Sequence, residues 1–163
     1  SNEEVSFKSI RWNQSGSAAT GDLANIKTYI DGDTTAYDVS VSSDGKYYTT
    51  SFPTPIKIGK GEYKEIYIKG DVVSGSGRTV DFDLYRYADI QVKGLTYGYD
   101  ILPSATDSGD SATDDDGTLQ EANPNYDAYE VAIGNGSITV TKATSVAAQN
   151  IAENVSNQVW GGV

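Results

Sequence analysis

Val5-Ser6-Phe7-Lys8-Ser9-Ile10-Arg11-Trp12, near the start of the chain, alternates apolar with polar residues. A period of two is typical of a β-strand that buries one face and exposes the other. The alternation changes phase between Phe7 and Ile10, which one extra residue in the strand would explain. We therefore expect a β-bulge near Ser9 that turns the strand.

The same alternation recurs along most of the chain in short runs. The further runs lie at residues 26–30, 37–41, 56–58, 65–69, 80–84, 90–92, 97–101, 129–133 and 137–141. Asp31-Gly32 and Asp44-Gly45 are typical hairpin turns, because Gly accepts a positive φ and Asp hydrogen-bonds its own backbone. The four prolines are expected between strands, where a missing N–H breaks no ladder. The pattern predicts an all-β fold, an antiparallel β-sandwich with Greek-key connections.

Composition narrows the chemistry that is available. The 163 residues carry a net charge of -11 and include no Cys, His or Met. These absences exclude disulfides, Cys/His zinc sites and Ser-His or Cys-His nucleophile pairs. The negative charge argues against nucleic acid as a partner, since phosphate binding requires a basic face. No run approaches the ~20 apolar residues of a membrane span, so we expect no membrane insertion.

The composition also favours an extracellular or cell-surface location. The chain is acidic, lacks Cys and is rich in Ser, Thr, Tyr, Asn and Gly. Three N-glycosylation sequons, at Asn13, Asn135 and Asn154, add little, since about two arise by chance in such a composition. The location is therefore a prediction from composition.

A long acidic segment interrupts the strand pattern. No Lys or Arg occurs between Lys93 and Lys142, and residues 104–125 are rich in Ser, Thr, Asp and Gly. This segment is too long for an ordinary hairpin. We interpret it as a loop inserted between two strands of the sandwich.

The aspartates of this loop are candidate ligands for calcium, which takes roughly six to eight hard oxygen ligands. Their spacing does not match an EF-hand, and a solvated acidic loop explains the same residues. Asp31 and Asp33 are a second candidate that hairpin chemistry also explains. The candidate calcium ligands are Asp107, Asp110, Asp114, Asp115 and Asp116.

Tyrosines offer a different kind of site. Tyr85 and Tyr87 share one strand face by alternation, and so do Tyr97 and Tyr99. Each pair can stack on a sugar ring or make lateral protein contacts. The high β propensity of Tyr explains the same positions without a ligand.

Asp81 and Asp83 alternate with the apolar residues Val80, Phe82 and Leu84. We therefore expect both carboxyl groups on the outer face of a strand rather than in a cleft. Glycoside hydrolysis requires two acids that face one substrate cleft. We expect that the chain is not an enzyme.

Several motifs follow one another in a fixed order. They are Val5-Ser6-Phe7-Lys8-Ser9-Ile10, Leu23-Ala24-Asn25-Ile26-Lys27-Thr28-Tyr29-Ile30-Asp31-Gly32, Pro55-Ile56-Lys57-Ile58-Gly59-Lys60-Gly61-Glu62-Tyr63-Lys64-Glu65-Ile66, Lys69-Gly70-Asp71-Val72-Val73-Ser74-Gly75-Ser76-Gly77-Arg78-Thr79-Val80 and Gly136-Ser137-Ile138-Thr139-Val140. In this order the chain resembles one repeat of the large surface-layer-like proteins of uncultured small-celled bacteria, which are built from tandem Ig-like modules. The resemblance covers most of the chain outside the acidic loop, and it implies an Ig-like fold.

The resemblance also implies that the unit is circularly offset. Modules of this kind have a strand before the segment that matches residues 5–10, whereas only four residues precede Val5. Residues 146–163 resemble a linker and the first strand of a following module, so the sandwich is expected within residues 1–145. A sandwich that lacks an edge strand exposes unpaired backbone groups and an open groove. The tail could enter its own groove or that of the next copy, or the chain could be cut from a longer tandem protein.

We predict a structural subunit that binds copies of itself or adjacent modules, head to tail, in a surface layer or filament. The C-terminal segment is the expected donor strand, because Val159 and Trp160 are apolar and favour burial. The residues assigned to assembly are Val155, Val159, Trp160, Val163, Val5 and Phe7. The alternative is a carbohydrate-binding or adhesive module of a larger surface protein, with a cell-surface glycan as its partner.

Overall fold

The computed structural model describes residues 2–105 and 119–136, and all elements named below lie within them. Strands dominate these residues, and no α-helix occurs among them. The only helical segments there are two single turns, η1 (Thr20–Asp22) and η2 (Tyr87–Asp89). All strand pairs are antiparallel, so the all-β prediction is confirmed and the arrangement is consistent with a β-sandwich.

The largest sheet is built around β1 (Val5–Gln14). Its strand order is β10 (Asp100–Ile101), β9 (Ile90–Gly94), β1, β5 (Tyr47–Ile58) and β4 (Ser40–Val41). β8 (Phe82–Asp83) pairs with the last residues of β1, on the side where β9 pairs with the first residues. Both edges of β1 are therefore paired along most of its length.

The predicted bulge near Ser9 is confirmed. β1 changes register against both β5 and β9 between Phe7 and Ser9. Phe7 pairs with Ile56 and Ser9 pairs with Ser51, so residues 52–55 of β5 lie opposite the bulge. Pro53 and Pro55 fall in this interruption and thus inside β5. Their expected position between strands was wrong, but their missing N–H groups break no regular pairing with β1.

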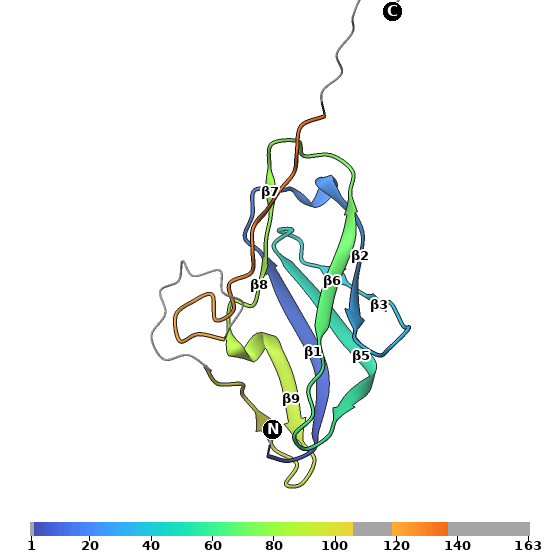
Figure 1. The fold of residues 1–163 in the computed structure, drawn as a ribbon, viewed down its shortest axis with the longest axis vertical. Helices are drawn as coiled ribbons and strands as arrows, with labels where there is room; N and C mark the ends of the chain where they lie inside the picture. The colour runs from blue at the N-terminus through green and yellow to red at the C-terminus, as the bar shows by residue number, and fades with distance from the viewer. Residues whose placement is uncertain (1, 106–118, 137–163) are drawn as a thin grey trace, which may run out of the picture.

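The remaining strands form a three-stranded and a two-stranded sheet (Figure 1). The first has the order β3 (Tyr37–Asp38), β2 (Leu23–Ile30) and β6 (Ile66–Val72). The second pairs β7 (Thr79–Val80) with β11 (Val131–Ala132). The strands expected at residues 80–84, 97–101 and 129–133 are thus shorter or divided in the structure.

Both predicted hairpin turns are confirmed. Gly32 has φ 76° between β2 and β3, and Gly45 has φ 74° between β4 and β5. The Gly45 N–H donates to the Ser42 carbonyl at 2.9 Å, which closes the second turn. Glycine occupies these positions because other residues rarely adopt a positive φ.

The hydrophobic core lies between β2–β6 and the largest sheet. β1 and β5 contribute buried aromatic rings, and the centroids of Phe7 and Phe52 are 4.9 Å apart. A hydrogen bond of 2.8 Å joins the Oγ1 atoms of Thr28 in β2 and Thr50 in β5, both fully buried. This bond links the two layers inside the core. The buried apolar cluster comprises Phe7, Ile10, Trp12, Ile30, Tyr48, Phe52 and Leu84.

The described end of the predicted acidic loop folds against the domain near β8. Tyr126 forms a backbone bridge with Leu84, and Gln120 and Asn125 are buried. The Asn125 side-chain amide donates to the carbonyls of Gln120 and Ala122, at 3.0 Å each. Residues 119–126 therefore hold their shape through internal hydrogen bonds and join the domain at Leu84.

Candidate functional site

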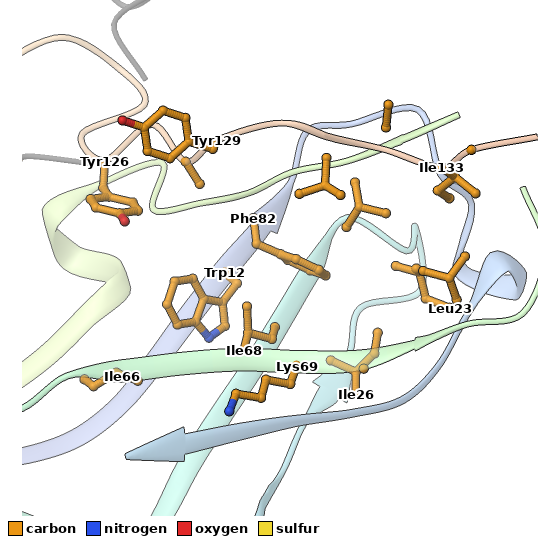
Figure 2. A pocket seen from close by; sticks show the side chains of 17 residues that line it. Trp12, Leu23, Ile26, Ile66, Ile68, Lys69, Phe82, Tyr126, Tyr129 and Ile133 are labelled. Atoms are coloured by element: carbon orange, nitrogen blue, oxygen red, sulfur yellow. The ribbon is translucent and has the colours of Figure 1, made fainter. Parts of the chain in front are cut away.

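An apolar groove opens between β6 and the chain that contains β11. It has a volume of about 690 Å³. Figure 2 shows Trp12 and Phe82 on its floor, with Ile66 and Ile68 of β6 along one side and Tyr129 and Ile133 on the other. The lining residues are Trp12, Leu23, Ile26, Ile66, Ile68, Lys69, Gly70, Val72, Val80, Phe82, Tyr126, Ala128, Tyr129, Val131, Ala132, Ile133 and Gly134.

The groove follows a strand edge that has no partner among the described residues. β6 pairs with β2 on one side and with no described strand on the other. The Asp31 N–H donates to the Glu65 carbonyl at 2.9 Å, and antiparallel ladders alternate in direction along a strand. The backbone groups of Ile66 and Ile68 therefore point away from β2, toward the groove.

The second border of the groove is also a strand edge. β11 pairs with β7 on one side only, within the described part of the chain. The side chains of Val72 and Val131 line the groove and yet are 53% and 61% exposed, and Tyr129 beside them is exposed as well. Two open edges with apolar side chains between them make a site for a further strand.

One polar atom on the floor of the groove lacks a partner. Trp12 is 7% exposed, and its Nε1–H makes no hydrogen bond with the described residues. A buried donor without an acceptor is costly, so an occupant that brings an oxygen atom would be favoured. Lys69 is the one charged residue among the described lining residues, and its Nζ lies 5.2 Å from the ring centroids of both Tyr29 and Tyr67. The groove is therefore mainly apolar, and the Trp12 Nε1–H is an unsatisfied side-chain donor beside the unpaired backbone of β6.

Three aspartates gather where β8 meets the segment after Tyr126. Oxygen atoms of Asp81, Asp83 and Asp127 lie within 4.8 Å of one another. Asp83 is 2% exposed and accepts hydrogen bonds from Ser15 Oγ at 2.5 Å and from the Ala128 N–H at 3.0 Å. The expectation that Asp81 and Asp83 lie on the outer face was wrong, because residues 126–128 cover that face of the strand.

The surroundings of the aspartate cluster favour the protonated form of Asp81 more than water does. Burial, followed by the neighbouring charge of Asp83, raises the pKa of Asp81 to about 7, and its buried Oδ1 atom has no hydrogen-bond partner among the described residues. Like charges in one buried site repel each other, so a shared proton relieves the repulsion. A divalent cation would neutralise the same charges, and these are the described residues that can hold one.

The predicted calcium loop stays a prediction. Asp107, Asp110, Asp114, Asp115 and Asp116 all lie outside the described residues. The second calcium candidate, Asp33, uses its oxygens in the turn. Its Oδ2 accepts the Tyr37 hydroxyl at 2.6 Å and its Oδ1 accepts the Thr35 N–H at 2.9 Å, and the Tyr37 bond is the main cause that lowers the pKa of Asp33.

The residues assigned to assembly fall in two places. Val5 and Phe7 are buried in β1, where β5 and β9 pair with both edges. They line no part of the groove, so the structure places the open edge at β6 and not at β1. The other four, Val155, Val159, Trp160 and Val163, lie outside the described residues.

The tyrosine pairs do not share strand faces. Tyr97 and Tyr99 flank Gly98, which has φ 75° in the turn between β9 and β10, and both side chains are largely exposed. Tyr85 is partly exposed beside Arg86, whereas the Tyr87 hydroxyl donates to the Gln120 carbonyl at 2.6 Å. Of the two pairs, only Tyr97 and Tyr99 present both rings to solvent.

Two of the three sequons lie in the described residues. Asn13 is half-buried within β1, paired with Tyr47 and with Asp83, which makes it a poor acceptor for a glycan. Asn135 is exposed near the last described residue, where its side chain contacts Ser76. Asn154 lies outside the described residues.

The alternation predicted strands for most of the groove residues, but it did not predict that they form a site. The alternation of Ile66 with Ile68, or of Val80 with Phe82, is the same whether a strand is covered or open. Asp127 joins Asp81 and Asp83 only through folding, since it follows Asp83 by 44 positions in the sequence. No local signal distinguishes either site.

Comparison of the chain with family models, with curated proteins and with solved structures finds no match in any of the three. The described residues contain no helix that is long and apolar enough to cross a membrane. The resemblance to surface-layer-like repeats and the extracellular location therefore stay predictions. Function has to be inferred from the groove and its surroundings.

Proposed function

We propose that this chain is a non-enzymatic structural subunit of an extracellular surface layer or filament, an Ig-like Greek-key module with an acidic inserted loop. It joins neighbouring copies or adjacent modules head to tail by accepting a β-strand. The observation that carries the proposal is the apolar groove between two strand edges that have no partner among the described residues.

The chemistry of the groove suits a strand better than a small molecule. Sites for small ligands combine apolar walls with a few converging polar side chains that orient the ligand. Here the polar side-chain groups of the described lining are few, those of Trp12, Lys69, Tyr126 and Tyr129, and the unpaired backbone of β6 borders the opening. Main-chain hydrogen bonds to an edge, with apolar pockets for alternate side chains, are the features of strand addition.

The chain has enough length to supply such a strand. Residues 137–163 follow the last described residue, and at about 3.3 Å per extended residue they can span roughly 90 Å. The apolar residues predicted to complement a groove, Val155, Val159, Trp160 and Val163, belong to this segment. Residues 137–163 of one copy are therefore long enough to reach the groove of a neighbouring copy.

Electron microscopy and light scattering of the purified full chain, over a range of concentrations, test the proposal. We expect polymers whose length increases with concentration. Val131→Glu places a charge in the groove and is expected to raise the concentration needed for assembly at least about tenfold, because a buried unpaired charge is costly. A chain that stays monomeric at every concentration would contradict the proposal.

Val73→Glu is the matched control. Val73 and Val131 are both 61% exposed, but Val73 does not line the groove. The control should assemble like the unchanged chain. If Val131→Glu and Val73→Glu behave alike, the groove is not the site of assembly.

A carbohydrate-binding or adhesive role is the second candidate, and the exposure of Tyr97 and Tyr99 favours it. Exposed aromatic rings on a turn can stack on sugar rings. A glycan array compares the unchanged chain with Tyr97→Ala/Tyr99→Ala. Specific binding that the double variant loses would support this role, and no binding to any glycan would remove it.

A further inference from the structure

One end of the groove lies where the described chain leaves the domain. Ile133 and Gly134 line the groove, and Gly136 is the last described residue. The Ile133 N–H donates to the Arg78 carbonyl at 2.8 Å, and its carbonyl accepts the Gly77 N–H at 3.0 Å. These bonds hold Ile133 beside the turn that joins β6 to β7 (Figure 1).

The described chain does not reverse its direction between Ile133 and Gly136. Gly134-Asn135-Gly136 has the composition of a turn, but residues 133–136 form no turn in the structure. They extend past the turn between β6 and β7 (Figure 1). A strand of residues 137–141 that closed the groove of its own copy would need a reversal between Ile133 and Ser137. The path of the described chain instead favours a groove on another copy.

The segment that follows Gly136 has the pattern of a donor strand. Ile138 and Val140 alternate with Ser137, Thr139 and Thr141, so both apolar side chains lie on one face of a strand. Both are β-branched, which suits a strand. This predicted strand lies outside the described residues.

The distal segment fits the groove less well. Val159 and Trp160 are consecutive, and consecutive residues of a strand point to opposite faces. Only one of them could enter the groove at a time. Gly161 and Gly162 follow directly, and glycine weakens a strand because it has no side chain to pack.

We propose that residues 137–141 of one copy fill the groove of a second copy, a step that rests on the proposed function and names its donor strand. Ile138 and Val140 enter between Trp12 and Phe82 of the acceptor. The donor backbone pairs with the free edge of β6 at Ile66 and Ile68, and a donor oxygen accepts the Trp12 Nε1–H.

Assembly of full-chain variants tests the donor. Ile138→Asp/Val140→Asp places two charges on the inserted face, and we expect it to remain monomeric at concentrations where the unchanged chain forms polymers. Ser137→Asp/Thr139→Asp is the matched control, since it adds the same charge to neighbouring positions on the other face. The control and Val159→Asp/Trp160→Asp are both expected to assemble.

The outcomes separate this inference from the proposed function. Loss of assembly in Val159→Asp/Trp160→Asp but not in Ile138→Asp/Val140→Asp would overturn the inference and leave strand exchange through the distal segment. A folded monomeric unchanged chain that Ile138→Asp/Val140→Asp destabilises would show that the strand closes its own groove. That result would overturn the inference and the proposed function together.

Fluorescence of Trp12 provides a second measurement that does not depend on polymer formation. The chain has two tryptophans, so Trp160→Phe leaves Trp12, on the groove floor, as the only one. A synthetic peptide of residues 135–142 is titrated into full-length Ile138→Asp/Val140→Asp/Trp160→Phe. We expect a saturable change in the emission. The same peptide carrying both Asp substitutions should give none, and equal responses or no response to either peptide would overturn the inference.

Discussion

β1 and β6 carry similar alternating apolar residues, but among the described strands only β1 is paired on both of its edges. β1 is paired with β5 on one edge and with β9 and β8 on the other, and Phe7 and Ile10 are almost fully buried. β6 is paired with β2 alone among the described strands, and its Ile66 and Ile68 are only half-buried. The same sequence pattern therefore serves as core in one strand and as an open edge in the other.

The difference shows that the neighbours of a strand determine its role. In β1 the apolar side chains contribute to the stability of the domain, because folding removes them from water. In β6 and β11 part of the apolar surface is still exposed, so its burial can contribute to binding. Substitutions in β1 should therefore lower the free energy of unfolding, whereas substitutions in the groove should weaken assembly.

The largest effect is expected in β1. Phe7→Ala removes a buried ring that packs against Phe52 and should lower the free energy of unfolding by about 3–5 kcal/mol. Urea unfolding followed by circular dichroism measures the change. Tyr63→Ala, at an exposed position, is the control and should change little. A Phe7→Ala effect no larger than the control would contradict the assignment of the core.

The next effect concerns the bond that links the two layers. Thr28→Val leaves the buried Thr50 hydroxyl without its partner and should cost about 1–3 kcal/mol of unfolding free energy. Thr28→Val/Thr50→Val removes both hydroxyl groups and should cost less than the sum of the single changes. Additive single effects in chemical denaturation would show that the hydroxyl groups do not interact.

A smaller effect, a gain rather than a loss of unfolding free energy, is expected at the aspartate cluster. The pKa of Asp81 is raised from 3.8 to about 7, so the native state favours the protonated form. Its stabilising contribution is complete below pH 3.8 and is lost as the pH rises through about 7. Asp81→Asn should thus raise stability at pH 8, by roughly 1 kcal/mol after allowance for solvent screening, and have less effect at pH 5.

Thermal melting at the two pH values measures the Asp81 effect. Asp83→Asn is the comparison variant and should stabilise less at pH 8, because it removes a neighbouring charge but also replaces one of the two oxygens that accept bonds from Ser15 and Ala128. A lower Tm for Asp81→Asn at pH 8 would contradict the role of charge repulsion. Melting of the unchanged chain in EDTA and in calcium chloride tests calcium separately, and an identical Tm would remove the calcium prediction.

The smallest effect is expected at the rim of the groove. Val72→Ala shortens a side chain that is more than half exposed, so the unfolding free energy of a monomer should change by no more than about 0.5 kcal/mol. The measurement uses the monomeric Ile138→Asp/Val140→Asp background. A loss as large as that of Phe7→Ala would show that β6 is covered like β1.

Local sequence signals were enough to predict many of the strands, the bulge near Ser9 and two hairpin turns, but not residues 47–55 of β5 or the short lengths of β10 and β11. Alternation, a change of phase and Asp-Gly pairs act over a few neighbouring residues, so they can be read directly. The groove and the aspartate cluster could not be predicted in this way. Tyr97 and Tyr99 show the same limit, since the alternation around Gly98 occurs in a turn and not in a strand.

The amino-acid order alone determined that this chain is all-β, because periodicity and turn chemistry depend on backbone geometry over short distances. Only the tertiary structure decided which strands are enclosed. The open edge of β6 and the burial of Asp83 under residues 126–128 depend on contacts between distant segments. The pairing and burial of a strand depend on its neighbours in the fold, and these neighbours come from distant parts of the chain.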